Sequence, residues 1–320
     1  MSIARLRRAG LAAALALAVP FGAASAQAPS QLIFHTGPAG GSWVPIGGAI
    51  TALYEKAIPG LKIENRPGAG LINIKAIEER KGHIGFGNMI STVDALRGVG
   101  QGVTQPYRNV CHVASLYPQI LQVTVRADAG IKSFADLRGK RAATLPRGNT
   151  TAVVAEQLLD LSGIGLAGLG RMAFVNTSDQ ANMFRDGQID SSILITTAPS
   201  SAIMDMANAR EIRMVDIDDA LFEKLRTANP GFSRYAMAKA TYPGMDRDNA
   251  TVQFPAQLVV SCELPEPMVH TMTKALVEGL PDLARVNAVF AAETVKTFCA
   301  PSAVPFHPGA ARYCKESGAM

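Results

Sequence analysis

The stretch Leu32-Ile-Phe-His-Thr-Gly-Pro-Ala-Gly-Gly-Ser-Trp-Val-Pro-Ile-Gly-Gly48 decides the fold of this chain. Its apolar start, residues 32–34, predicts a short buried strand, and the glycines after it predict a turn whose backbone can approach another molecule. Ser42 is a favourable N-cap, and Pro45 suits the first turn of a helix. The free amides of such a helix start carry partial positive charge and can receive a carboxylate or phosphate. A plain strand-to-helix turn without a ligand has the same pattern.

The first 26 residues differ from the rest of the chain. Residues 5–8 hold three arginines, residues 9–23 are apolar, and residues 24–26 read Ala-Ser-Ala. This is the pattern of a secretory signal peptide cleaved before Gln27, so we expect a periplasmic protein; an uncleaved anchor is the alternative. Loss of the three arginines lowers the formal net charge from +5 to +2. A nearly neutral mature chain gives no nucleic-acid signal, so no nucleic-acid partner is expected.

Strand and helix patterns alternate twice along the mature chain, which predicts an α/β protein with parallel sheets covered by helices. The first series begins at residue 32, and the second occupies residues 119–255. An extended apolar run at 254–262 is a candidate strand returning from the second lobe to the first. We therefore expect lobe one to comprise residues 27–118 and 256–320, and lobe two to comprise 119–255.

Three polar, glycine-containing turns each precede a predicted helix. In open α/β sheets, ligands bind beyond the carboxyl ends of the strands. Two lobes facing each other would therefore place these turns on both walls of one cleft. With Asn88 at another strand end, the residues expected to contact a ligand are Gly40, Gly41, Ser42, Trp43, Arg66, Gly70, Asn73, Arg147, Gly148, Asn149, Thr150 and Thr151.

These turns predict an anionic small molecule as the ligand. Their backbone amides and polar side chains donate hydrogen bonds, and Arg66 and Arg147 are candidate counter-charges. Trp43 could form a wall of the pocket or belong to the core. The ligand's identity is left open at this point.

No motif for catalysis or for a cofactor accompanies these turns. Gly163-x-Gly165-x-x-Gly168 matches a dinucleotide fingerprint but follows a predicted helix instead of a strand, so it predicts a loop. The five histidines lack the short spacings of metal ligands, and Asp186 and Asp190 flank a predicted solvated turn. We expect no catalytic residue, no metal site and no cofactor; an exported enzyme is the less favoured alternative.

The chain contains four cysteines, which an exported protein can join in three alternative ways. Cys299 and Cys314 bracket a proline-rich loop and are the expected pair. The absence of a Cys-x-x-Cys sequence argues against a redox motif or a zinc knuckle.

Motifs along the whole mature chain resemble the TAXI-type solute receptors of TRAP transporters. They are Thr36–Ser42, Ala114–Pro118, Val125–Lys140, Asp186–Asp190 and the C-terminal Val304-Pro-Phe-His-Pro-Gly-Ala-Ala-Arg-Tyr313. The resemblance implies a type II periplasmic-binding-protein fold, with two lobes that are joined by two crossing strands and close on a small carboxylate. Dicarboxylates and acidic amino acids are typical ligands, and integral-membrane TRAP permease subunits are the implied partners. The resemblance adds Tyr117, near the hinge, and Thr196 and Thr197 to the expected binding residues.

The chain departs from that family at its presumed pocket. The stretch Glu64–Asn73 is closer to the tripartite-tricarboxylate receptors, and Arg147-Gly-Asn-Thr150 replaces a Gly-Ser-Gly-Thr run. A tripartite-tricarboxylate-type or sensor-coupled receptor of the same fold is therefore the alternative.

Overall fold

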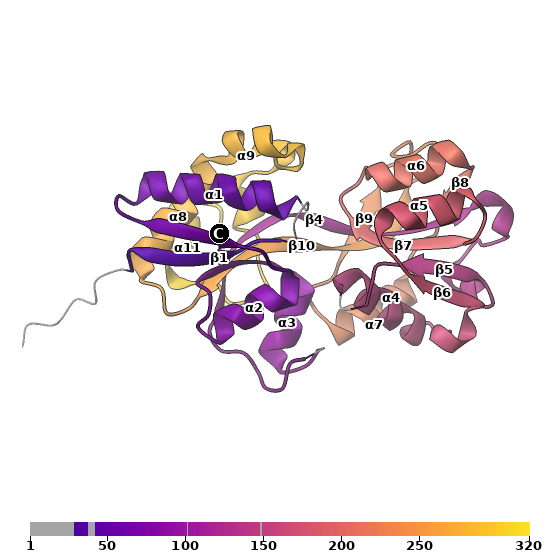
Figure 1. Ribbon diagram of the computed structural model, residues 1–320, viewed down its shortest axis with the longest axis horizontal. Helices are drawn as coiled ribbons and strands as arrows, with labels where there is room; N and C mark the ends of the chain where they lie inside the picture. Colours follow the sequence, from indigo (N-terminus) through magenta and orange to yellow (C-terminus); the bar gives the residue numbers. More distant parts are fainter. Residues whose placement is uncertain (1–28, 38–41, 101, 148) are drawn as a thin grey trace, which may run out of the picture.

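The computed structural model describes residues 29–37, 42–100, 102–147 and 149–320. The predicted signal peptide, Gly40, Gly41 and Gly148 lie outside these ranges. Two lobes lie side by side and are joined by two long strands, β4 and β10 (Figure 1). In the part of the chain described, no helix combines the length and apolar character needed to cross a membrane.

Lobe one begins with the strand-and-helix alternation that the sequence predicts. Its first elements are β1 (Gln31–His35), α1 (Trp43–Ala57), β2 (Lys62–Arg66), α2 (Gly70–Glu78), β3 (Ile84–Asn88) and α3 (Met89–Arg97). β1 lies between β2 and β3 and is parallel to both. All three strands therefore end at the same edge of the sheet, where α1, α2 and α3 begin.

The two connecting strands, β4 (Val110–Arg126) and β10 (Asn249–Ser261), pair with each other antiparallel. β10 also pairs with β3 in lobe one and with β9 in lobe two. The sequence predicted two runs broken at Tyr117-Pro118, but β4 is one strand of 17 residues. Pro118 is tolerated because it faces Pro255, next to a shift in register, where neither residue could donate a ladder hydrogen bond.

Lobe two continues the alternation. Its elements are β5 (Arg141–Thr144), α4 (Thr150–Leu161), β6 (Arg171–Phe174), α5 (Thr177–Arg185), β7 (Ser191–Thr196), α6 (Ser201–Ala209), β8 (Ile212–Met214), α7 (Asp219–Ala228) and β9 (Ser233–Met237). The strand order of the whole sheet is β2-β1-β3-β10-β4-β7-β5-β6. Because the returning strand β10 is inserted between β3 and β4, the structure has the predicted type II periplasmic-binding-protein fold.

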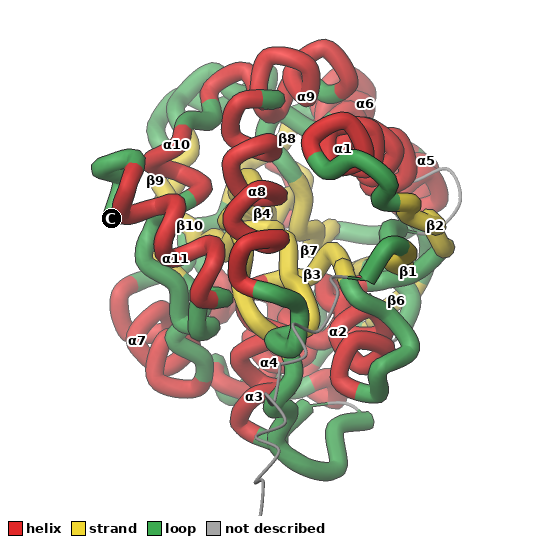
Figure 2. The backbone as a smooth tube through the Cα atoms, turned by 90° about the vertical axis from the view of Figure 1, so that its left-hand side faces the viewer, coloured by secondary structure: helices red, strands yellow, loops and turns green. Residues whose placement is uncertain are grey.

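The C-terminal part of the chain returns to lobe one as helices. These are α8 (Glu266–Glu278), α9 (Leu280–Val286), α10 (Val295–Phe298) and α11 (Pro308–Glu316). Figure 2, which looks onto the lobe-one end, shows α1, α8 and α11 around the strands, and α8 contacts both other helices. Their apolar faces complete the core of lobe one.

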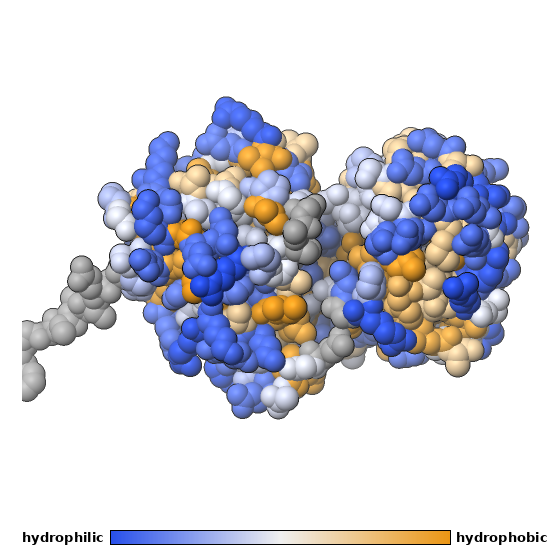
Figure 3. Space-filling model, in the orientation of Figure 1, coloured by the Kyte–Doolittle hydropathy of each residue, from blue (hydrophilic) through white to orange (hydrophobic). Residues whose placement is uncertain are grey.

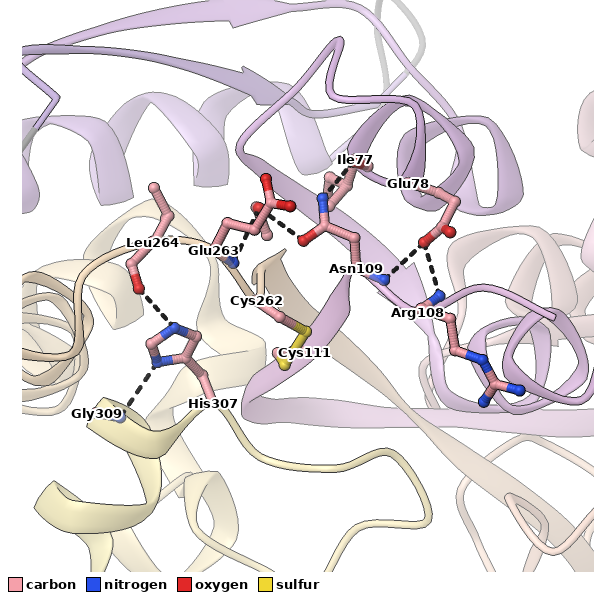
Figure 4. Close-up of a disulfide and its surroundings, with 11 residues drawn as sticks. Ile77, Glu78, Arg108, Asn109, Cys111, Cys262, Glu263, Leu264, His307 and Gly309 are labelled. Atoms are coloured by element: carbon pink, nitrogen blue, oxygen red, sulfur yellow. Dashed lines mark hydrogen bonds between the residues drawn. A yellow bond between two sulfur atoms is a disulfide. The ribbon is translucent and has the colours of Figure 1, made fainter.

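Two disulfides lie in lobe one. Cys299–Cys314 has a Cα–Cα distance of 5.5 Å, which confirms the predicted pair. The second, Cys111–Cys262, joins the start of β4 to the residue after β10. In Figure 4 this disulfide lies near His307, whose Nε2 forms a 2.9 Å hydrogen bond with the carbonyl oxygen of Leu264.

Candidate functional site

A cavity of about 590 Å³ opens between the two lobes, and its volume is in the range of small-molecule sites. The space-filling view shows the narrow waist between the lobes (Figure 3). The described residues that line the cavity are Ser42, Trp43, Ala69, Gly70, Leu71, Ile72, Asn88, Tyr117, Gln119, Leu145, Pro146, Arg147, Asn149, Thr150, Thr151, Ile195, Thr196, Thr197, Phe254, Asn287 and Val289.

Four helices begin at this cavity. α1, α2 and α3 come from lobe one, and α4 comes from lobe two. The N-cap or first residue of each helix lines the cavity: Ser42 and Trp43, Ala69 and Gly70, Asn88, and Asn149 and Thr150. Because the first amides of a helix lack intrahelical acceptors, these helix starts give the cavity a positive electrostatic character.

The starts of α2, α3 and α4 come together at one point, which we call the Gly70 junction (Gly70, Asn88 and Thr150). Asn88 Nδ2 donates a hydrogen bond to Thr150 Oγ1 across the two lobes, at 3.1 Å. A β-carbon added to Gly70 would lie 3.5 Å from Asn88 Nδ2 and 3.7 Å from Thr150 Oγ1. One group bound here could therefore contact both lobes at once.

Trp43 and Tyr117 form a rigid aromatic part of the wall. Trp43 Nε1 donates to Tyr117 Oη at 2.8 Å, and the two rings pack against Phe86 and Phe290. Burial raises the pKa of Tyr117 to about 12, so its hydroxyl is neutral at physiological pH. Trp43 thus both lines the cavity and packs on the core of lobe one, which combines the two alternatives from the sequence.

Arg147 is the one charged side chain among the described lining residues. Its Nη1 lies 3.4 Å from Glu156 Oε1, and its guanidinium lies 4.3 Å from the centre of the Phe174 ring. The arginine is 62% exposed, so it remains able to move toward an anion. Its role as a counter-charge for the ligand stays a prediction.

The structure brings together eleven of the residues predicted to contact a ligand. They are Ser42, Trp43, Gly70, Asn88, Tyr117, Arg147, Asn149, Thr150, Thr151, Thr196 and Thr197. Gly40, Gly41 and Gly148 lie outside the described residues.

Arg66 and Asn73 are not at the cavity wall. Arg66, at the end of β2, forms two hydrogen bonds with Glu64, at 2.8 and 2.9 Å. Asn73 is fully buried; its Oδ1 accepts from the Ala69 amide, and its Nδ2 donates to two main-chain carbonyls. Arg66 is thus paired elsewhere, and Asn73 holds the turn before α2 in place.

The sequence interpretation omitted several lining residues. Gln119 and Phe254 flank the facing prolines Pro118 and Pro255, and a strand crossing between lobes was the signal that could have found them. Asn287 and Val289 come from a 3₁₀ segment after α9. Their sequence gives no sign of the site, since only the packing of the C-terminal helices brings them there.

No group of three or more His, Cys, Asp or Glu side chains is arranged to hold a metal ion in the described ranges. The described lining residues offer hydrogen bonds, the Arg147 guanidinium and apolar contacts.

Comparisons with known proteins give a family and several distant structural likenesses. Residues 34–318 match the NMT1-like family. The alkanesulfonate-binding protein SsuA of Xanthomonas axonopodis pv. citri is 18% identical over 83% of both chains, with a TM-score of 0.46. A putative L-cystine ABC transporter protein of Listeria monocytogenes is 15% identical over 82% of this chain and 96% of its own, with a TM-score of 0.49.

These likenesses say nothing about the ligand of this chain, because every one of these TM-scores is below 0.5. The fold assignment rests instead on the observed strand order. The match to the NMT1-like family agrees with the periplasmic-binding-protein part of the predicted resemblance but does not support its TAXI part.

Proposed function

The chain belongs to the NMT1-like family, and we propose that it is an extracytoplasmic receptor that captures a small organic anion between its lobes. The observation that carries this proposal is the Gly70 junction, where helix starts from both lobes meet beside a cavity of about 590 Å³. Amides and a helix dipole favour an anion, and two lobes allow the site to close around it.

Ligand binding would stabilise the closed arrangement because the ligand contacts both lobes only when they are together. The hydrogen bond between Asn88 and Thr150 spans the cleft, and Asn229 of lobe two donates to the Ile90 carbonyl of lobe one at 2.8 Å. We place the hinge at the facing prolines Pro118 and Pro255. The lobe boundaries proposed from the sequence, after residues 118 and 255, fall at this pair.

The receptor would deliver its ligand to integral-membrane transport subunits. Delivery to a TRAP permease stays a prediction of the motif resemblance, which the family match does not support. A tripartite-tricarboxylate-type permease or a sensor remains the alternative partner. Mass spectrometry of membrane proteins crosslinked to the exported receptor tests this, since each partner class is identified by its subunits.

We propose a binding protein and not an enzyme. Neither the sequence motifs nor the described lining residues supply a nucleophile paired with a base. A bound ligand should therefore be released unchanged, which mass spectrometry of the solute before and after binding checks.

The test of the receptor function uses thermal unfolding and the fluorescence of Trp43, the only tryptophan of the chain. The purified protein is titrated with carboxylates, sulfonates and amino acids. A ligand at 100 times its dissociation constant should add about 2.7 kcal/mol of stability. Arg66→Gln serves as a control because Arg66 pairs with Glu64 and is not among the described residues that line the cavity. If no organic anion changes stability or fluorescence, the proposal is overturned.

A further inference from the structure

We propose that the ligand is an organic monoanion with an apolar body and no ammonium group. This inference rests on the proposed receptor function and narrows its ligand class. It starts from the charges around the cavity: Arg147 is positive, and the described lining residues include no Asp or Glu.

An amino acid fits such a cavity poorly. Its ammonium would leave water when the lobes close, and a buried cation needs a carboxylate or an equivalent set of acceptors. Glu156, the acid paired with Arg147, lines a neighbouring groove formed by α4 and does not line the cavity. The positive helix starts would add to the penalty, because they repel a second positive charge.

A polyanion also fits poorly. Arg147 carries the single guanidinium among the described lining residues, and it is already paired with Glu156. One carboxylate or sulfonate can be balanced by the helix starts together with this arginine. A second or third carboxylate on the same ligand would enter the closed cavity without a counter-charge, and the desolvation of that charge would oppose binding.

The rest of the lining suits an apolar body. Leu145, Ile195 and Phe254 contribute apolar surface from lobe two and from the strand that crosses between the lobes, and Leu71 and Val289 face them from lobe one. Apolar ligand surface that these side chains remove from water contributes to affinity roughly in proportion to its area. The ligand would therefore gain affinity through its hydrocarbon part and orientation through its one anionic group.

The anionic group belongs at the Gly70 junction. There the first amides of α2 lie beside the Asn88 and Thr150 side chains, which come from opposite lobes. Gly70 is helical, and an added methyl would meet both polar groups at ordinary contact distances. Gly70→Ala therefore fills the place of the anion without straining the backbone.

The first experiment compares ligands with one carbon skeleton but different charges, using Trp43 fluorescence and calorimetry. Phenylpyruvate, phenyllactate and phenylalanine share one carbon skeleton. Citrate is added as a polyanion, and hexanesulfonate is added as an apolar monoanion with a different anionic group. Phenylpyruvate, phenyllactate or hexanesulfonate should bind at least 100-fold more tightly than phenylalanine or citrate. Tightest binding by phenylalanine or citrate would overturn this inference while leaving the receptor function intact. Absence of binding by every anion would overturn the receptor function itself.

The second experiment places the anionic group. Gly70→Ala should weaken binding of the preferred monoanion at least tenfold with an unchanged unfolding midpoint. Gly48→Ala is the matched control, because Gly48 is exposed on α1 and an added β-carbon there meets nothing within 4 Å. Unchanged affinity in Gly70→Ala would overturn the placement of the anionic group.

Discussion

The two lobes build similar sheets from different kinds of chain segment. Lobe one combines the beginning and the end of the mature chain, whereas lobe two is one continuous stretch between β4 and β10. All four cysteines lie in lobe one, and Cys111–Cys262 joins residues separated by 151 positions. Lobe one therefore depends on contacts between chain segments that precede lobe two and segments that follow it in the sequence.

The difference follows from chain entropy. Bringing the ends of a long loop together costs conformational freedom, and a crosslink removes that cost from the unfolded chain. Lobe two closes shorter loops and has no cysteine in its sequence. One of its ion pairs joins the start of β5 to the residue before β7, where Asp190 accepts from Arg141 Nη2 at 2.6 Å.

The largest expected effect tests the crosslinks of lobe one. Replacing both Cys111 and Cys262 by serine should lower the free energy of unfolding by about 5 kcal/mol, because this disulfide closes the longer loop. The same change at Cys299 and Cys314 should cost about 3 kcal/mol, since that loop spans 15 residues. Denaturant unfolding of both variants measures the difference. An equal or larger loss for the short loop would contradict the entropic explanation.

The next effect tests the ion pair of lobe two. Asp190→Asn should lower stability at neutral pH by about 2 kcal/mol, because Arg141 loses its charged acceptor. Hydrogen bonds from Arg141 hold the pKa of Asp190 below its usual value. Its contribution is therefore complete above about pH 4 and is lost as pH falls through the folded pKa.

Asp186→Asn is the matched control, since Asp186 is an exposed residue that pairs only with Arg185 at the surface. It should change stability by less than about 0.5 kcal/mol. Unfolding curves at several pH values compare the two variants. A difference between wild type and Asp190→Asn that persists at low pH would rule out the ion pair as its cause.

A smaller effect tests whether the lobes share one site. Asn88→Ala removes the hydrogen bond to Thr150 across the cleft, so it should weaken ligand binding by about 1 kcal/mol, or roughly fivefold. Titration followed by Trp43 fluorescence measures this change. Thr51→Ala removes a hydrogen bond of similar length within lobe one and should leave affinity unchanged. Equal affinities for all three proteins would mean that the cleft bond does not contribute.

The smallest effect concerns the guanidinium of Arg147 in lobe two. Glu156→Gln releases Arg147 from its 3.4 Å partner, which should raise affinity for the anion about twofold to threefold at low ionic strength. The gain should shrink in salt, because exposed charges are screened. Glu223→Gln, which disrupts an ion pair with Arg226 on α7, provides the control. A decrease in affinity in Glu156→Gln would indicate that Glu156 positions the arginine.

Local patterns predicted much of the fold and of the candidate site. The glycine-containing turns predicted the starts of α1 and α4, and both starts line the cavity. Asn149 caps α4 by accepting from the Thr151 amide, whereas Ser42, the predicted N-cap of α1, makes no capping hydrogen bond through its side chain. α7 and β9 were missed, although Asp218 caps α7 by accepting from the Leu221 amide. Leu221, Phe222 and Leu225 are spaced to lie on one face of a helix and are buried, so the periodic signal was present in the sequence and was not used.

Two expectations differ from the structure for different reasons. Arg66 was predicted to contact the ligand, but it pairs with Glu64, two positions away, and is not among the described residues that line the cavity. The continuity of β4 depends on a distant partner, because its Pro118 faces Pro255 of β10, where neither proline needs to donate a ladder hydrogen bond.

The amino-acid sequence by itself determined most of the strands and helices, the polar helix starts and the pairing of Cys299 with Cys314, because these depend on residues near one another in the chain. Only the tertiary structure decided which helix starts meet, how Asn88 reaches Thr150, and how Asn287 and Val289 complete the cavity wall. Those contacts join segments more than 60 residues apart. Such contacts depend on how the two lobes pack around two shared strands. The local periodicity of the sequence does not predict that packing.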